Sequence, residues 1–225
     1  MTLRFVSAGA AQGLVRSVAA GKGVDIDGKF GAVGAMLEHF KAGEPCDVVI
    51  LTRSQVDQLI AEGDVDPATV RDVGPVATAI AVREKDPSPK VSDAASLKAA
   101  LLACDAIYYP DSVKSTAGFH FAKVLSKLGI RTEGEARACT FPNGTLAMAA
   151  LAKAGGQPIG CTQATEILAT PGVKLVGPLP AGFDLSTTYT AAVSTRAADP
   201  RGAADFVARL TGPALAAARR DAGFQ

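Results

Sequence analysis

The sequence predicts an α/β fold of two lobes, in each of which helices flank a mixed sheet. Strand-like and helix-like segments alternate along almost all of the 225 residues, which is typical of α/β proteins. The apolar run at 47–51 is typical of a buried parallel strand. Breaker-rich segments near 84–90 and 177–187 predict two hinge crossings between the lobes. Residues 1–83 and 188–225 are therefore expected to form lobe 1, and residues 84–187 lobe 2.

The first lobe is predicted from short apolar runs that are each followed by a helical pattern. In chain order we expect a strand at 3–6, a helix at 11–20, a strand at 24–30, a helix at 33–41, a strand at 47–51, a helix at 54–62 and a strand at 73–83. Ser54 is expected to cap the helix at 54–62, because a serine oxygen can accept from the free N–H groups of a helix start.

The second lobe and the returning segment continue the alternation. We expect a helix at 96–103, a strand at 106–109, helices at 116–128 and 144–153, strands at 159–162, 173–176 and 187–193, and terminal helices at 200–210 and 213–222. Gly129 follows the last apolar residue of the helix at 116–128 and is a C-cap signal. Pro110 closes the strand at 106–109.

Composition excludes several classes of function. The formal net charge is +1 and no Lys/Arg run stands out, so a nucleic-acid partner is not expected. No stretch reaches about 18 consecutive apolar residues, so no membrane insertion is expected. Two histidines and four cysteines without a CxxC pair predict no metal site, and the absence of a glycine-rich nucleotide fingerprint predicts no cofactor. No export signal is visible, so a cytoplasmic protein is expected, or a periplasmic one if a leader was removed.

The opening of the chain predicts an anion-binding turn. A short strand reaches Ser7, and the small residues Gly9, Ala10 and Ala11 follow where a helix begins. Small side chains leave backbone N–H groups uncovered at the positive end of the helix. A similar arrangement recurs at Ser115 and Thr116. If the two turns face each other, they form a binding site for a small anion. Tight turns and ordinary N-caps would give the same local sequence pattern.

Four segments carry a resemblance to a known family. They are Ser7-Ala8-Gly9-Ala10, Gly43-Glu44-Pro45-Cys46-Asp47-Val48-Val49-Ile50, Ser115-Thr116-Ala117-Gly118, and Val176-Gly177-Pro178-Leu179-Pro180 followed by Thr188-Tyr189-Thr190-Ala191-Ala192-Val193. Their order and spacing resemble the molybdate-binding proteins of ABC importers, which have the type II periplasmic-binding-protein fold.

The resemblance implies an anion held by hydroxyls and backbone N–H groups. Ser7 matches the serine of the first loop, and Tyr189 matches a tyrosine on the returning strand. The resemblance also implies that helix starts in the second lobe face the ligand, which makes Asn143 and Gln163 candidates beside Ser115 and Thr116. It further implies transporter subunits as partners if the protein is exported.

The chain departs from the family pattern at the second loop. Where the family has a serine, this chain reads Gly31-Ala32-Val33-Gly34, which has no hydroxyl. Val33 would instead present an apolar side chain to the ligand. A missing hydrogen bond to a charged ligand is worth about 1–3 kcal/mol. Lys114 adds a cation before the helix at 116–128, and a lysine beside hydroxyls suits a carboxylate. The ligand class therefore stays open between a molybdate-like oxyanion and an organic carboxylate.

The resemblance extends to enzymes that look like aconitate isomerases, which move a double bond by a proton shift. An isomerase of this type is the alternative to a solute-binding protein. Its proton relay would come from His120, Lys114 or Tyr109. His120 also has an ordinary reading as a packing residue, and Lys114 as a solvated residue. An anion-responsive regulatory module is a third reading.

Overall fold

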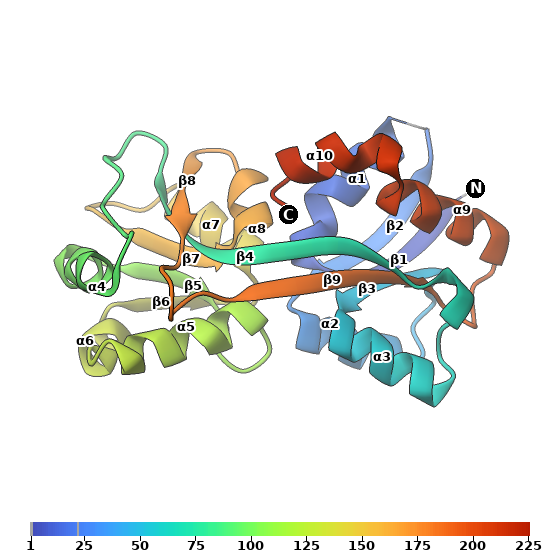
Figure 1. The fold of residues 1–225 in the computed structure, drawn as a ribbon, viewed down its shortest axis with the longest axis horizontal. Coiled ribbons are helices and arrows are strands. Elements are labelled where there is room, and N and C mark those ends of the chain that lie inside the picture. The colour runs from blue at the N-terminus through green and yellow to red at the C-terminus, as the bar shows by residue number, and fades with distance from the viewer. Residues whose placement is uncertain (1, 22) are drawn as a thin grey trace. The chain divides into compact units, whose positions relative to one another are not determined.

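The computed structural model describes residues 2–21 and 23–225 and divides into two compact units (Figure 1). Unit 1 runs from the N-terminus to Val76 and includes Thr187–Gln225, and unit 2 is Ala77–Ser186. The chain leaves unit 1 within strand β4 (Arg71–Arg83) and returns to it at the start of strand β9 (Ser186–Val193).

The sheet of unit 1 has the strand order β2-β1-β3-β9. β1 is parallel to β2 and β3, whereas β9 runs antiparallel to β3. The parallel strands are β1 (Thr2–Ala8), β2 (Asp25–Gly31) and β3 (Val48–Thr52). β3 is buried from Val48 to Leu51, as its continuous apolar sequence predicts.

Helices cover both faces of the unit 1 sheet. Helices α2 and α3 lie on one face, and α1 and α9 lie on the other (Figure 1). Phe5 on β1 packs edge-on against Phe206 on α9, with 5.2 Å between the ring centroids. The helical segments are η1 (Gly9–Ala11), α1 (Gln12–Ala20), α2 (Val33–Lys41), α3 (Arg53–Glu62), η2 (Pro67–Thr69), α9 (Pro200–Thr211), η3 (Pro213–Leu215) and α10 (Ala216–Asp221).

The sheet of unit 2 has the order β4-β7-β5-β6, and β8 also pairs with β4. β5 is parallel to β6 and β7, whereas β4 is antiparallel to both β7 and β8. These strands are β5 (Ile107–Pro110), β6 (Ala138–Phe141), β7 (Ile159–Gln163) and β8 (Val173–Pro178).

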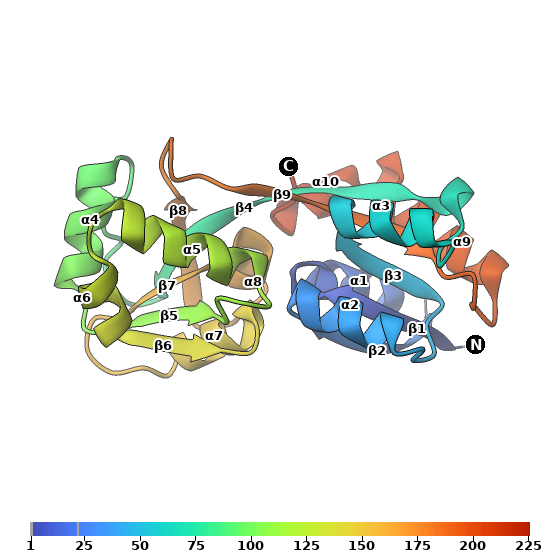
Figure 2. The same ribbon diagram turned by 90° about the horizontal axis from the view of Figure 1, so that it is seen from below.

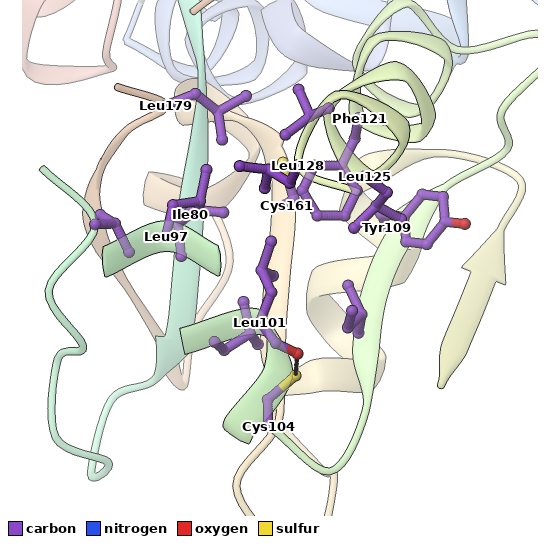
Figure 3. Packing of buried hydrophobic residues seen from close by; sticks show 14 of the residues in the cluster. Ile80, Leu97, Leu101, Cys104, Tyr109, Phe121, Leu125, Leu128, Cys161 and Leu179 are labelled. Carbon is purple, nitrogen blue, oxygen red and sulfur yellow. Dashed lines mark hydrogen bonds between the residues drawn. The ribbon is translucent and has the colours of Figure 1, made fainter. Parts of the chain in front are cut away.

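Helices α5 (Thr116–Lys127) and α7 (Gly144–Leu151) lie on opposite sides of strand β7 (Figure 1 and Figure 2). Cys161 belongs to the same buried cluster as Phe121 on α5 and Ile80 on β4 (Figure 3). A Cβ at Gly160 would instead lie 2.6 Å from Met148 on α7. The two helices therefore cover opposite faces. The helices of unit 2 are α4 (Ala94–Ala103), α5 (Thr116–Lys127), α6 (Arg131–Ala136), α7 (Gly144–Leu151) and α8 (Ala164–Leu168).

One capping prediction is wrong, and four short elements were not predicted. Thr52, rather than Ser54, caps α3, because the Thr52 side chain accepts from the N–H of Gln55 and the Gln55 side chain accepts from the N–H of Thr52. The unpredicted elements are η2, α6, β6 and α8, none of which exceeds six residues. Such lengths are too short for a periodic pattern to show. Within the described ranges, none of the helices combines the length and apolar character needed to cross a membrane.

Candidate functional site

The three parallel strands of unit 1 end at one edge of its sheet, and each is followed by a helix. Ala8 at the end of β1 lies opposite Gly31 at the end of β2. Ser7 lies opposite Ile50, two residues before the end of β3. The helices α1, α2 and α3 therefore begin side by side, with their positive ends at this carboxyl edge.

Two of these three helix starts present backbone N–H groups that no side chain of the described residues caps. The turn η1 that opens α1 follows Ala8, and α2 follows Ala32, and neither start receives a side-chain hydrogen bond. Gly9, Ala10 and Ala11 are all buried, so their backbone N–H groups have little access to water. An anion is the partner that such a helix start favours.

Ser7 and Val33 flank the uncapped starts. Ser7 is completely buried, and its hydroxyl donates to the carbonyl oxygen of Ala8 at 3.0 Å. Val33 is 8% exposed and is the first residue of α2. Its carbonyl oxygen accepts a bond from Nε2 of Gln55 at 3.4 Å, which ties α2 to the capped start of α3. Tyr189 is also buried and lies opposite Thr52 in the β3–β9 pairing.

Unit 2 has a second carboxyl edge of the same kind. Pro110 and Phe141 end β5 and β6 opposite each other, and β7 ends nearby at Gln163. Helices α5, α7 and α8 start at this edge. Ser115 caps α5 by accepting from the N–H of Gly118 at 3.4 Å, so the helix start already has one internal acceptor. Thr116 is partly exposed at the first helical position.

A buried carboxyl group faces the start of α7. Asn143 caps this helix through the N–H of Leu146 at 2.9 Å. Glu166 on α8 accepts from the hydroxyl of Thr162 at 2.5 Å, and its carboxylate lies against Gly144 at the start of α7. Burial raises the pKa of Glu166, and the Thr162 hydroxyl and the nearby backbone N–H groups oppose that shift. Asn143 and Gly144 thus begin a helix whose positive end already meets an internal carboxyl.

The fit around Glu166 is close. A Cβ at Gly144 would lie 1.9 Å from Oε2 of Glu166 and 2.0 Å from Oγ1 of Thr162. Only a glycine lets the backbone of α7 approach the carboxyl at this distance. The start of α7 is consequently held to β7 and α8.

Gln163 differs from the other predicted polar residues because its side chain is buried and unpaired. It is 3% exposed, and within the described part of the chain neither Oε1 nor Nε2 has a hydrogen-bond partner. The hydroxyls of Thr165 and Thr78 share this state. A buried polar group without a partner costs about 1–3 kcal/mol, so several at one place call for explanation.

The three residues predicted as proton relays lie in different surroundings. Tyr109 is buried, packs edge-on against Phe121 at 5.3 Å, and has its pKa raised by burial. His120 contacts the carbonyl oxygen of Phe183 through Nε2 at 2.7 Å, so that nitrogen carries the proton and donates it to this bond. Lys114 is exposed in the loop before α5, where Asp111 accepts from its backbone N–H at 2.7 Å. Their roles as relays remain predictions.

Sequence reasoning missed two polar residues of unit 2, namely Glu166 and Thr78. Glu166 comes directly before the apolar pair Ile167 and Leu168, and no recognisable motif surrounds it. The available signal was the density of polar residues at 162–166, which follows a buried strand and has no glycine or proline. Thr78 lies in the middle of β4 and gives no signal in the sequence.

Comparison with known proteins assigns the chain to a family. The chain belongs to the bacterial extracellular solute-binding protein family, which it matches over residues 3–225. It is 27% identical to an aconitate isomerase from Pseudomonas sp over 234 residues, a match that covers 100% of this chain and 87% of that protein.

Solved structures give the same fold. The periplasmic molybdate-binding protein of Azotobacter vinelandii matches with a TM-score of 0.80 and 18% identity over 99% of this chain and 98% of that one. The sulfate-binding protein of Mycobacterium tuberculosis H37Rv matches with a TM-score of 0.70 and 17% identity over 100% and 86%. The predicted α/β fold of the type II periplasmic binding proteins is confirmed, as is the resemblance to molybdate-binding proteins and their aconitate-isomerase-like relatives.

Proposed function

We propose that this solute-binding protein takes a small anion, either an oxyanion or an organic carboxylate, and that units 1 and 2 act as its two lobes. The pair of uncapped helix starts at the carboxyl edge of unit 1 supports the proposal most strongly. Backbone N–H groups at a helix start combine hydrogen bonding with the positive end of the helix dipole. A hydrogen bond to a charged group is worth about 1.5–3 kcal/mol, so a few such bonds give micromolar binding.

The proposed contacts come from both units. In unit 1 they are the hydroxyl of Ser7, the N–H groups of Gly9, Ala10 and Ala11, and the apolar side chain of Val33. In unit 2 they are Ser115 and Thr116 at the start of α5, Asn143 at the start of α7, and Gln163 at the end of β7. Tyr189 is the proposed contact from the returning strand. The molybdate-binding and sulfate-binding proteins of the same fold support an anionic ligand.

A panel of anions tests the proposal by thermal shift. Molybdate, tungstate, sulfate, citrate, cis-aconitate and trans-aconitate are each added to the protein at millimolar concentration. A ligand at a hundred times its Kd stabilises the folded state by about 2.7 kcal/mol, which raises Tm by several degrees at this size. Ser7→Ala and Ser115→Ala are expected to weaken binding of the active anion by about tenfold each, because each removes a hydroxyl near a charge.

A serine at the other end of α5 supplies the control. Ser126 is exposed, and its hydroxyl bonds within the helix to the carbonyl of Ala122. Ser126→Ala should therefore leave anion affinity unchanged. The proposal fails if no anion raises Tm, or if Ser126→Ala weakens binding as much as Ser115→Ala does.

The alternative function is an isomerase acting on an aconitate-like polycarboxylate in the same site. The aconitate isomerase that matches the whole of this chain at 27% identity supports it. His120, Lys114 and Tyr109 remain the proposed relay groups, and Lys114 is the one that is exposed at a helix start. If an aconitate isomer raises Tm, incubation followed by proton NMR decides between the two functions, since a binder returns its ligand unchanged.

The further partners depend on the function. The family description is of extracellular proteins, so transporter subunits are the proposed partners if the native chain is exported to the periplasm. The isomerase alternative goes with a cytoplasmic protein that needs no such partner.

A further inference from the structure

Two unpaired side chains of unit 2 lie on neighbouring strands, one in the middle of β4 and the other at the end of β7. Thr78 on β4 is directly opposite Gln163 on β7 in the antiparallel register. Residues opposite each other point to the same face of a sheet, with Cβ atoms roughly 5 Å apart. Yet neither Thr78 Oγ1 nor either polar atom of Gln163 has a partner among the described residues. Two neighbouring groups that could bond to each other do not.

This face is the one that α5 covers. Gln163 follows Cys161 by two residues, and Thr78 precedes Ile80 by two, so each continues the row of its apolar neighbour. Cys161 and Ile80 pack in one cluster with Phe121 of α5 (Figure 3). The polar pair therefore extends the apolar face towards the carboxyl edge, where α5 begins at Thr116.

Thr165 adds a third buried side chain at the same end of β7. It stands two residues after Gln163, is 4% exposed, and its hydroxyl is unpaired within the described part of the chain. The three residues are here called the unpaired set, Thr78, Gln163 and Thr165. Buried polar atoms in native proteins almost always have partners, so a ligand group is the natural partner for these atoms.

The chemistry of the unpaired set restricts that ligand. Hydroxyls and the Nε2 amide of Gln163 can donate to an oxyanion, but Oε1 of Gln163 only accepts. Sulfate and molybdate are fully deprotonated at neutral pH and offer no donor. An organic acid with a hydroxyl beside its carboxylate offers both acceptors and a donor.

We propose that the unpaired set is a subsite for the hydroxyl and adjacent carboxylate of a small hydroxycarboxylate. The proposal rests on the anion-binding function above and names its ligand class. In this arrangement the ligand hydroxyl donates to Oε1 of Gln163, and a carboxylate oxygen accepts from Nε2 and from the threonine hydroxyls.

Matched acids with and without a hydroxyl test the subsite by isothermal titration calorimetry. The pairs are citrate with tricarballylate and malate with succinate, with molybdate and sulfate as donor-free anions. At least one hydroxylated acid should bind at least about tenfold more tightly than its partner, because a site built to pair a hydroxyl discriminates strongly against its loss. Gln163→Met keeps the size of the side chain and should reduce this ratio to about one.

A stability measurement makes the variant informative even without ligand. Gln163→Met removes two buried unpaired groups, so the ligand-free protein should gain about 2–4 °C in Tm. Gln157→Met, at an exposed position in the loop before β7, should change neither Tm nor the affinity ratio.

The outcomes separate this inference from the proposed function. If molybdate, sulfate or the hydroxyl-free acids bind as tightly as the hydroxy acids, the subsite is wrong and anion binding stands. If no anion binds, both are wrong. The subsite proposal is also wrong if Gln163→Met leaves the affinity ratio between the hydroxylated and hydroxyl-free acids unchanged, or if it lowers Tm.

Discussion

Replacing Gly118 with alanine is expected to destabilise the protein by at least about 3 kcal/mol. Gly118 lies in the first turn of α5, and an added Cβ would be 2.2 Å from the carbonyl oxygen of Pro110 and 2.3 Å from that of Asp111. Both are backbone atoms, so neither can swing away as a side chain would. Alanine favours a helix over glycine by only about 1 kcal/mol, and overpacking at a fixed backbone costs more than that.

The effect of Gly118→Ala should appear as a loss of Tm of roughly 6 °C or more in thermal unfolding. Gly155→Ala is the matched control, because a Cβ at Gly155 meets nothing within 4 Å and its φ is not in the left-handed region. That variant should melt close to the wild type. An unchanged Tm for Gly118→Ala would mean that α5 does not approach the end of β5 this closely.

Asp47→Ala should cost about 3 kcal/mol of stability. Asp47 is 2% exposed, and its carboxylate accepts from Nε and Nη2 of Arg4, at 2.9 and 2.7 Å. It also accepts from the backbone N–H groups of Arg4 and Ala198, at 2.8 and 2.7 Å. Arg4 retains access to water, but the two N–H groups lose their partner, and breaking such a buried network is strongly destabilising.

The contribution of Asp47 to the free energy of unfolding should depend on pH. The hydrogen bonds from Arg4 lower the pKa of Asp47 from 3.8 to about 2 in the folded protein. A depressed pKa stabilises the folded state above pH 4, and this contribution of about 2 kcal/mol disappears as the pH falls through 2. Urea unfolding of wild type and Asp47→Ala should therefore give stabilities that converge between pH 4 and pH 2.

An exposed carboxylate is the control for Asp47. Asp57 pairs with Arg53 one turn earlier on the surface of α3, where 51% of its side chain is exposed. Asp57→Ala should change stability little at any pH, because solvent screens such pairs. A constant difference between wild type and Asp47→Ala across the acid range would contradict the depressed pKa.

Most of the fold is readable from the sequence because its elements are bounded by strong local signals. The buried run at β3 and the apolar-to-small transition after β1 specify parallel strands followed by helices. Gly129 has φ of +66°, as its position after α5 predicts. What the local patterns do not give is β6, whose four residues pair with β5 only through long-range contact.

The candidate site was predicted only in part, and the reason differs between units. In unit 1 the proposed contribution of Gly9–Ala11 comes from their own backbone N–H groups, which a run of small residues in the sequence indicates directly. In unit 2 the polar groups at the edge depend on packing partners. Glu166 lies against Gly144 at the start of α7, 22 residues earlier in the chain, and Thr78 lies opposite Gln163, 85 residues later. Such pairings depend on strand order, which no local pattern encodes.

A titration followed by amide NMR tests the central claim most directly. Nitrogen-15-labelled protein is titrated with citrate and, separately, with molybdate, and the backbone N–H signals are followed. Anion binding at the helix starts predicts saturable shifts that are largest for Gly9, Ala10 and Ala11 in unit 1 and for Thr116 and Ala117 in unit 2. Saturable shifts confined to other parts of the chain, or no saturable shifts with either anion, would contradict the claim that the N–H groups at these helix starts hold the ligand.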